Sequence, residues 1–363
     1  MKICSIIGAR PQFIKEAIIS LQVQNIKAWD HILVHSGQHY DVNMSDIFFS
    51  DFNLPKPKYN LNIGSDTHAI MTAKTIIETE RVLLAEKPDA IIVYGDTNTT
   101  LAAAIVASKL VIPIIHIEAG IRMIPKSMPE EINRVLVDHI SSILCCCSEL
   151  GALNLKNEGI FNGVNITGDI MYDCFLHMSK FFKPKDICKK YNLENNKYII
   201  ATLHRDYNVD IQNNLLECMK GLVKLQKETG YTVIFPLHPR TKKNLIKFGY
   251  IDILSQLKTI EPQGYIDLMS LLLSCNFVVT DSGGLQKEAY FAGKRTIVVM
   301  PDTGWRELIE YGWNFLSNAV SNNILENSMN LLSSTSQYPQ FIYGDGHSKD
   351  KIIDCILKFL TNI

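Results

Sequence analysis

The sequence carries almost no net charge. Its 36 lysines and arginines stand against 37 aspartates and glutamates, which leaves a formal net charge of -1. Without an overall positive field the chain has no long-range attraction for nucleic acid or for an anionic membrane, so we expect neither as a partner. An anionic ligand would have to be held by local groups at a defined site.

Long apolar runs are also missing. No uninterrupted apolar stretch approaches the roughly 20 residues that a membrane-spanning helix needs. Near the start, the polar residues 8–12 follow the strand-like residues 1–4 too closely for the apolar region of a signal peptide. These absences predict a cytoplasmic protein without a membrane segment.

Cysteines in the spacing of a zinc or redox motif are absent as well. There are nine cysteines, and none of them forms a CxxC pair. Three are adjacent, Cys145, Cys146 and Cys147, and we interpret them as a buried strand in a reducing compartment rather than as a metal site. We expect no metal ion.

The chain does have the composition of a packed protein and a regular alternation of strands and helices. Hydrophobic residues make up 47% and charged residues 20% of its 363 residues, a length that favours two domains. Short apolar runs such as KICSII and AIIVYG alternate with helical patterns, which is typical of a parallel sheet covered on both faces. We predict an α/β fold of two Rossmann-like domains with a central cleft, residues 1–168 and 169–345, and a helix in residues 346–363 that packs back on the first domain.

Polar segments follow the predicted strands directly. They are GARPQ, SGQHYD, YGDTNTT, IEAGIR, TLHRD, PLHPR and TDSGG. Ligands of such sheets bind beyond the carboxyl ends of the strands. The sequence therefore predicts that these segments converge on one cleft.

Two of these segments have the character of phosphate sites. Residues 281–284, DSGG, lie between a strand and a helix, where free backbone N–H groups and the helix dipole favour an anion; a plain turn is the alternative. Glu288, further along that helix, could reach a ribose hydroxyl. Arg10 and Lys15, after the first strand, could complement a pyrophosphate or lie in a solvated first turn.

Histidines end two other predicted strands. His204 follows YIIATL and His238 follows TVIFPL, and a cation comes after each within two residues. A single histidine of this kind is more often structural, but two at equivalent places favour a function in the cleft.

Three carboxylates lie at strand or helix ends. Asp96 follows AIIVYG and could instead cap a helix, while Glu118 ends the strand IIHI, where a charge needs a partner or a function. Glu131 lies in a first helical turn, which the helix dipole favours. We interpret its neighbour Glu130 as an i,i+4 partner of Arg134. Acids that converge near cations can have separate pKa values for proton removal and delivery.

In their order and spacing, these motifs resemble the non-hydrolysing UDP-N-acetylglucosamine 2-epimerase family. The resemblance covers nearly the whole chain, through GARPQFIK, SGQHYD, YGDTNTT, HIEAGIR, MPEEINR, LHR, PLHPR, TDSGG with QKEA, and YGDG at residues 343–346. It implies a glycosyltransferase-B type fold and a reaction that inverts C2 of a UDP-2-acetamido sugar. UDP is eliminated in the anti sense to leave a 2-acetamidoglucal and is then added back, without nicotinamide or metal. The product would supply cell-surface polysaccharides.

The resemblance also implies roles for individual residues. The first domain would carry the catalytic carboxylates and the second would bind UDP, in a protein that needs no cofactor and forms a homodimer. Which carboxylate serves which face of C2 is left open. The implied catalytic residues are Asp96, Glu118, Glu131, His204 and Lys15; the implied UDP contacts are Arg10, His204, His238, Ser282, Gly283, Gly284 and Glu288; the implied effector site is Gln38 and His39.

Some positions depart from the family's pattern and leave alternatives. Residues 300–304, MPDTG, stand where relatives commonly carry an Arg-Asp pair and a further Glu, and Tyr207 stands where many have Glu. The segments SGQHYDVNMSDIFF and PEEINRVLVDH look most like the branch acting on UDP-2,3-diacetamido-2,3-dideoxyglucuronate. Further alternatives are a hydrolysing 2-epimerase, a glycosyltransferase of the same fold and a non-catalytic nucleotide-sugar sensor.

Overall fold

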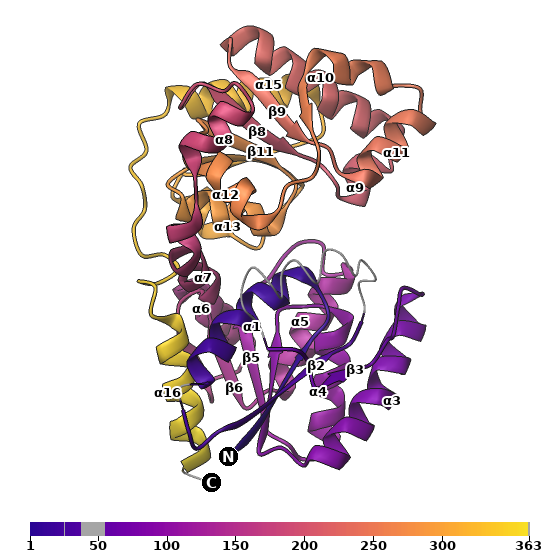
Figure 1. Ribbon diagram of the computed structural model, residues 1–363, viewed down its shortest axis with the longest axis vertical. Helices are drawn as coiled ribbons and strands as arrows, with labels where there is room; N and C mark the ends of the chain where they lie inside the picture. The colour runs from indigo at the N-terminus through magenta and orange to yellow at the C-terminus, as the bar shows by residue number, and fades with distance from the viewer. Residues whose placement is uncertain (25, 38–54, 362–363) are drawn as a thin grey trace. The chain divides into compact units, whose positions relative to one another are not determined.

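The chain forms two compact units, which are described separately below (Figure 1). The computed structural model describes residues 1–24, 26–37 and 55–361, apart from the side chain of Arg10. Gln38 and His39, the expected effector residues, lie outside the described residues. Unit 1 comprises Met1–His177 with Phe341–Ile363, and unit 2 comprises Met178–Gln340. No helix in the described part of the chain is long and apolar enough to cross a membrane.

Unit 1 is built on a parallel sheet with the strand order β3-β2-β1-β4-β5-β6-β7. Its central strands are buried on both faces, as their continuous apolar sequences require. Cys145 and Cys146 lie in β6, and Cys147 follows directly; all three are buried, which confirms the interpretation of the triplet as a buried strand. The strands are β1 (Lys2–Ile7), β2 (Asp30–His35), β3 (Tyr59–Asn60), β4 (Ala90–Tyr94), β5 (Ile114–Ala119), β6 (Ile143–Cys146) and β7 (Val164–Ile166).

Local sequence explains where the helices of unit 1 begin. The side chain of Thr97 accepts a hydrogen bond from the Thr100 backbone N–H, so Thr97 is the N-cap of α4. Pro129 occupies the first position of α5, where its missing N–H costs nothing. The helices are α1 (Arg10–Val23), α3 (His68–Glu86), α4 (Asn98–Lys109), α5 (Pro129–Ile140), α6 (Glu149–Asn157), α7 (Ile170–Met178) and α16 (Ser348–Thr361).

The last helix, α16, packs within unit 1 against α1 and β6. The Asp173 carboxylate in α7 accepts hydrogen bonds from the backbone N–H groups of Ser348 and Lys349, at 3.0 and 2.9 Å. Gly168 and Gly344, with φ of 82° and 88°, approach so closely that a Cβ on Gly168 would lie 3.1 Å from the Gly344 Cα. These contacts keep α7 with unit 1, so unit 1 ends at His177 rather than at residue 168, and the chain returns to it at Phe341 rather than at residue 346.

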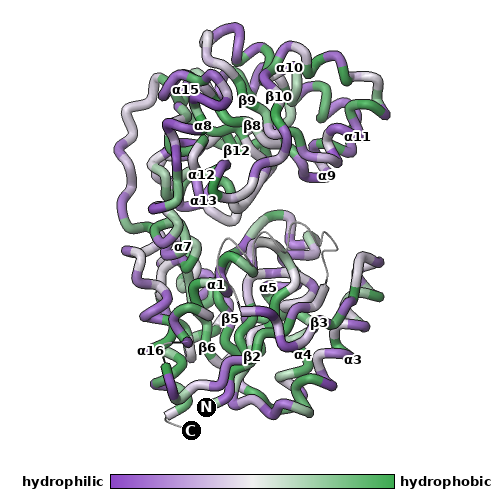
Figure 2. Tube along the Cα trace, viewed as in Figure 1, coloured by the Kyte–Doolittle hydropathy of each residue, from purple (hydrophilic) through white to green (hydrophobic). Residues whose placement is uncertain are grey.

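Unit 2 contains a second parallel sheet, β10-β9-β8-β11-β12-β13, whose six strands follow the order of the first six strands of the seven-stranded sheet in unit 1. Its buried core is formed by residues of the sheet and of α10, α11 and α15, and the strands of both units are mostly hydrophobic in Figure 2, whereas α11 and α15 show hydrophilic stretches. The strands are β8 (Tyr198–Thr202), β9 (Thr232–Pro236), β10 (Lys258–Ile260), β11 (Phe277–Thr280), β12 (Arg295–Val299) and β13 (Phe315–Ser317). The helices are α8 (Pro184–Lys190), α9 (Asp206–Val209), α10 (Gln212–Thr229), α11 (Pro239–Lys247), α12 (Tyr265–Ser274), α13 (Gly283–Phe291), α14 (Arg306–Glu310) and α15 (Ser321–Ser333), with the 3-10 turns η1 (Ser179–Phe181) and η2 (Ile251–Gln256).

Both sheets have the order of a doubly wound Rossmann-type fold, which confirms the predicted fold class. The order reverses between β1 and β4 in unit 1 and between β8 and β11 in unit 2. Ligands of such sheets bind at these reversals, beyond the carboxyl ends of the strands. Among the expected site residues, Asp96 and Glu118 lie at the ends of β4 and β5, and His204, His238 and Ser282 follow the ends of β8, β9 and β11.

Candidate active site

In unit 1, a buried glutamine joins the turns that follow β1 and β4. The Oε1 atom of Gln12 accepts hydrogen bonds from the backbone N–H groups of Gly8 and Ala9, at 2.7 and 3.0 Å. Its Nε2 donates to the Tyr94 carbonyl at 2.7 Å and to the Thr100 hydroxyl at 2.9 Å. One side chain therefore fixes the two turns at the switch point of the sheet, a role that the sequence did not predict.

Glu118 and Lys15 form an ion pair next to these turns. The Lys15 Nζ lies 2.7 Å from the Glu118 Oε1, and the side chains are only 4% and 13% exposed. Glu118 has a φ of 73°, a left-handed conformation that costs a residue other than glycine roughly 1–3 kcal/mol. The register of β5 and β6 shifts between Ile117 and Ala119. This irregularity at the strand end turns the carboxylate towards the lysine.

Arg134 joins the other two expected carboxylates. One of its terminal nitrogens lies 2.6 Å from the Glu131 Oε2, and the other donates to the Asp96 carboxylate. Burial lowers the pKa of Arg134, but the negative charges of Asp96 and Glu131 outweigh it and raise that pKa. Helix spacing predicted Glu130 as the partner of Arg134 and did not predict the contacts with Glu131 and Asp96. Since Thr97 caps α4, Asp96 is not its N-cap, and the capping alternative for Asp96 is wrong.

The Lys15–Glu118 pair and the group formed by Arg134, Glu131 and Asp96 meet at Gly95. A Cβ built on Gly95 would be 3.2 Å from the Glu118 Oε1 and 3.7 Å from the Lys15 Nζ, and Asp96 is the next residue in the chain. Unit 1 thus brings together a set that we call the carboxylate cluster: Lys15, Asp96, Glu118, Glu131 and Arg134. Three acids and two cations at the ends of β4 and β5 and the start of α5 can stabilise a developing positive charge and transfer protons.

One group of side chains near this cluster has the composition of a metal site. Donor atoms of Glu118, Cys147 and Asp169 lie within 4.8 Å of one another, the one such group in residues 1–24, 26–37 and 55–361. The Lys15 ammonium already compensates the charge of Glu118. The expectation of a protein without metal remains a prediction.

In unit 2, Asp281 holds His204. The fully buried Asp281 carboxylate accepts hydrogen bonds from the backbone N–H groups of His204 and Arg205 and from the Asn208 amide, at 3.0 to 3.1 Å. His204 Nδ1 lies 3.2 Å from the Asp281 Oδ1. Burial raises the pKa of Asp281, but the contacts with His204 and the other donors outweigh it and lower that pKa. The carboxylate thus fixes Nδ1 and leaves the opposite nitrogen, Nε2, for a ligand. The sequence predicted Asp281 only as part of the DSGG turn and did not predict its contact with His204.

His238 lies beside His204, with ring centroids 5.5 Å apart. Its Nδ1 accepts a hydrogen bond from the Arg240 backbone N–H and makes His238 the N-cap of α11. Burial and the charge of His204 lower the pKa of His238. The structure therefore shows both a structural use for His238 and its proximity to His204.

The turn at residues 281–284, which we call the glycine turn, leads into α13. The Ser282 Oγ accepts a hydrogen bond from the Leu285 backbone N–H, and the helix begins at Gly283. Trp305 Nε1 donates to the Gly283 carbonyl at 2.9 Å, and the buried Lys287 Nζ lies 3.9 Å from the Trp305 ring centroid. The helix N-terminus and a buried cation together favour an anion at this turn.

Other predicted residues lie around the same turn. Glu288 is 8% exposed in α13. The Thr303 hydroxyl, in the segment that departs from the family's pattern, donates to the Gln286 side chain of α13 at 2.7 Å. The departures at residues 300–304 therefore adjoin the glycine turn.

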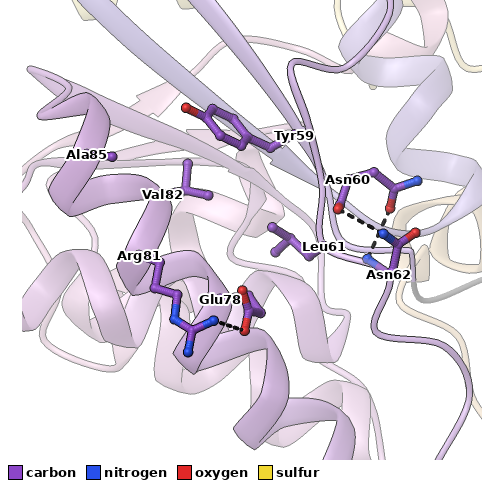
Figure 3. A pocket seen from close by; sticks show the side chains of 8 residues that line it. All are labelled: Tyr59, Asn60, Leu61, Asn62, Glu78, Arg81, Val82 and Ala85. Carbon is purple, nitrogen blue, oxygen red and sulfur yellow. Dashed lines mark hydrogen bonds and ion pairs between the residues drawn. The ribbon is translucent and has the colours of Figure 1, made fainter.

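A surface pocket of unit 1 lies elsewhere, between β3 and α3 (Figure 3). It contains an ion pair between Arg81 and Glu78 at 2.8 Å and hydrogen bonds between Asn60 and Asn62. None of the expected site residues that the structure describes lines it. Its lining residues are Tyr59, Asn60, Leu61, Asn62, Glu78, Arg81, Val82 and Ala85.

Comparisons with known proteins agree on one family. A family model described as UDP-N-acetylglucosamine 2-epimerase matches residues 21–357. A UDP-N-acetylglucosamine 2-epimerase homolog of Methanococcus maripaludis is 43% identical over 98% of this chain and 99% of its own. A UDP-2,3-diacetamido-2,3-dideoxy-D-glucuronate 2-epimerase of Pseudomonas aeruginosa is 41% identical over 99% of this chain and 100% of its own.

A solved structure agrees with these relatives. It is the UDP-GlcNAc 2-epimerase of Methanocaldococcus jannaschii in complex with UDP-GlcNAc and UDP, which is 39% identical. The match has a TM-score of 0.91 and covers 99% of this chain and 100% of the other.

Proposed function

This chain belongs to the UDP-N-acetylglucosamine 2-epimerase family, and from that membership we propose that it inverts C2 of a UDP-2-acetamido sugar from gluco to manno. The reaction would proceed by anti elimination of UDP and the C2 proton to a 2-acetamidoglucal, followed by re-addition of UDP with a proton delivered to the opposite face of C2. The observation that carries the proposal is the carboxylate cluster, in which two cations hold three acids at the ends of β4 and β5 and the start of α5.

The chemistry of C2 explains why acids and cations are needed together. The C2 proton is not acidic, so cleavage of the C1–O bond must run ahead and build positive charge on the ring. Carboxylates fixed in advance stabilise that charge and remove or return the proton. We propose that Glu118, Asp96 and Glu131 share these tasks and that Lys15 orients Glu118. This chemistry requires no cofactor.

We propose that unit 2 holds the UDP moiety. The N–H groups of the glycine turn, with Lys287 behind them, would bind the diphosphate, and Glu288 would bind the ribose. His204, fixed by Asp281, would donate to the phosphate or to the leaving oxygen from Nε2. The remaining proposed UDP contacts in unit 2 are His238, Ser282, Gly283 and Gly284. The contact expected of Arg10, which belongs to unit 1, stays a prediction.

The comparisons support two substrates. Relatives at 43% and 40% identity are named for UDP-N-acetylglucosamine, and one at 41% is named for UDP-2,3-diacetamido-2,3-dideoxy-D-glucuronate. We propose UDP-N-acetylglucosamine as the substrate, with the diacetamido sugar as the second candidate.

The nine free cysteines fit a reducing, cytoplasmic location.

We propose that a second copy of the chain covers an exposed apolar surface of unit 1. Ile70, Ile77 and Leu84 recur every seven residues along α3 and are 41%, 52% and 55% exposed. Exposed apolar residues in such a row are typical of protein interfaces. An Ile77→Lys variant should elute as a monomer in size-exclusion chromatography with light scattering, and an unchanged mass would contradict this interface.

The decisive experiment is a panel of UDP-sugars followed by proton NMR in deuterated water. Deuterium at C2 and a manno epimer, without any acceptor, would support the proposed reaction and identify the substrate. Free N-acetylmannosamine as the main product would instead show a hydrolysing enzyme, and product formation only with an acceptor would show a glycosyltransferase. UDP binding without exchange at C2 would show a sensor.

A further inference from the structure

A buried pair of side chains, His116 and Asp138, lies behind the carboxylate cluster. Both side chains are fully buried, and His116 Nδ1 lies 2.7 Å from the Asp138 Oδ1. His116 precedes Glu118 by two residues in β5, and Asp138 lies in α5, the helix that carries Glu131. The pair therefore connects the elements that carry two of the proposed catalytic acids.

The imidazole ring of His116 holds the loop that leads into Asp96. Its Nε2 lies 2.8 Å from the carbonyl oxygen of Gly95. A carbonyl oxygen only accepts, so Nε2 carries a proton, and Nδ1 donates to the ionised Asp138. The ring thus donates from both nitrogens and ties Gly95 to α5.

The same carboxylate holds the chain after Glu118. Asp138 Oδ2 accepts hydrogen bonds from the Gly120 backbone N–H at 3.2 Å and from Arg122 at 2.7 Å. Gly120 has a φ of 81°, and a Cβ there would lie 2.2 Å from the Gly151 carbonyl oxygen, so the backbone is tightly confined. The left-handed Glu118 stands two residues before this anchor.

We propose that Asp138, directly and through His116, is a positioning residue that fixes the chain at Asp96, after β4, and at Glu118, at the end of β5. The inference rests on the proposed function, because the catalytic roles of both acids are part of it. Asp138 touches no reacting atom. Misplacing a catalytic group by about 1 Å can cost roughly 100-fold in rate. Loss of this anchor should therefore lower kcat strongly and change substrate affinity only slightly.

The geometry predicts which substitutions are tolerated. In Asp138→Asn, the amide oxygen can accept from Gly120 and Arg122, while the NH2 group donates to Nδ1 of a neutral His116 that keeps its proton on Nε2. All the anchoring hydrogen bonds then survive. In Asp138→Ala the acceptors are lost, and the N–H of Gly120 loses this partner.

A matched control lies at the outer end of the same network. Glu158 pairs with Arg122 at 2.6 Å, and its side chain is 30% exposed. Glu158→Gln changes the charge of the network but leaves the hydrogen bonds to Gly95 and Gly120 in place. It should therefore keep wild-type turnover.

The test measures kcat and KM for epimerisation of the UDP-sugar that the wild type converts. We expect Asp138→Ala to lower kcat by about 100-fold with KM within about threefold. Asp138→Asn should retain at least about a fifth of the wild-type kcat, and Glu158→Gln should stay within about twofold. Three outcomes would each overturn the inference. They are near-normal turnover in Asp138→Ala, turnover in Asp138→Asn as slow as in Asp138→Ala, and turnover in Glu158→Gln as slow as in Asp138→Ala. A wild type that converts no UDP-sugar would instead refute the proposed function.

If Asp138→Ala shows no cooperative thermal unfolding, it is not folded and cannot test the positioning role. Two His116 variants then provide the test. The amide nitrogen of Gln can replace Nε2 and keep the hydrogen bond to Gly95, whereas that of Asn can replace only Nδ1. His116→Gln should therefore turn over at least about tenfold faster than His116→Asn. Equal rates in the two variants would overturn the positioning role.

Discussion

Glu118→Gln removes one negative charge from the carboxylate cluster while keeping the size of the side chain. Proton transfer by a positioned group contributes about 100- to 10,000-fold to catalysis, and an amide cannot perform it. Since Glu118 would also stabilise the charge on the sugar ring, we expect kcat to fall by about 1,000-fold, or about 4 kcal/mol of activation free energy. The proposed UDP site of unit 2 does not include Glu118, so UDP affinity should stay within about threefold.

The cost of the same substitution to stability follows from the pair with Lys15. The ammonium and carboxylate lie 2.7 Å apart, with 4% and 13% of the side chains exposed. A hydrogen bond between charged groups contributes about 1.5–3 kcal/mol, and the amide oxygen that replaces the carboxylate restores about 1 kcal/mol. The free energy of unfolding should fall by about 1–2 kcal/mol, which lowers the Tm of a unit of roughly 200 residues by about 2–8 °C.

Both effects can be measured on one preparation. Proton NMR in deuterated water reports epimer and C2 exchange, titration calorimetry reports UDP affinity, and scanning calorimetry reports Tm. Glu130→Gln is the matched control, because Glu130 lies beside Glu131 on α5 but was assigned no catalytic role. Near-normal turnover in Glu118→Gln, or an equal loss in Glu130→Gln, would refute the reasoning.

Four further predictions test the rest of the site. Arg134→Met leaves the buried Glu131 without its cation and should lower the free energy of unfolding by about 3 kcal/mol by calorimetry; an unchanged Tm would contradict it. Ser282→Ala removes the N-cap of α13 and should weaken UDP binding about tenfold and destabilise the helix by about 1 kcal/mol; unaltered UDP affinity would argue against the glycine turn as the UDP site. Lys287→Met should weaken binding of UDP but not of uridine, since we propose that the buried ammonium acts on the diphosphate; equal losses would indicate a structural role. The pKa of Asp281 is lowered from 3.8, so its contribution to stability is present above 3.8 and is lost as pH falls through the lower folded pKa; Asp281→Asn should therefore lose less stability than wild type below pH 3.8, and parallel acid titrations would exclude this contribution.

The fold could be predicted because its signals are local. Apolar runs of strand length alternate with helical patterns, and this alternation predicts two parallel sheets. The carboxyl ends of parallel strands lie along one edge, so polar segments such as those at Asp96 and Glu118 were expected to come together within a sheet. Gly95, the residue before Asp96, lies beside the Glu118 carboxylate, so these two segments do come together in unit 1.

The partners of the site residues could not be predicted in the same way. Arg134 donates to a carboxylate 38 residues earlier in the chain, whereas helix spacing links it only to near neighbours such as Glu130. Asp138 lies 22 residues after His116, and Asp281 lies 77 residues after His204. These contacts depend on how α5 packs on the sheet and on which strands are adjacent. The spacing of residues along the chain predicts neither the packing of the helix nor the order of the strands. The boundary of unit 1 was misplaced for the same reason, because α7 is held by residues near the C-terminus.

Glu118 was predicted as a site residue, but its left-handed backbone conformation could not be predicted from the sequence. A left-handed φ is cheap for glycine and costs glutamate roughly 1–3 kcal/mol, yet glutamate stands there and glycine stands two residues later. The surrounding structure supports the costly conformation on both sides. The Gly95 backbone N–H donates to the Ile117 carbonyl at 2.9 Å, and the Gly120 N–H donates to Asp138. Glu118→Gly would relieve the backbone strain but would remove the partner of Lys15. The hydrogen bonds on both sides of Glu118 are therefore best explained as holding this carboxylate in place despite its strained backbone.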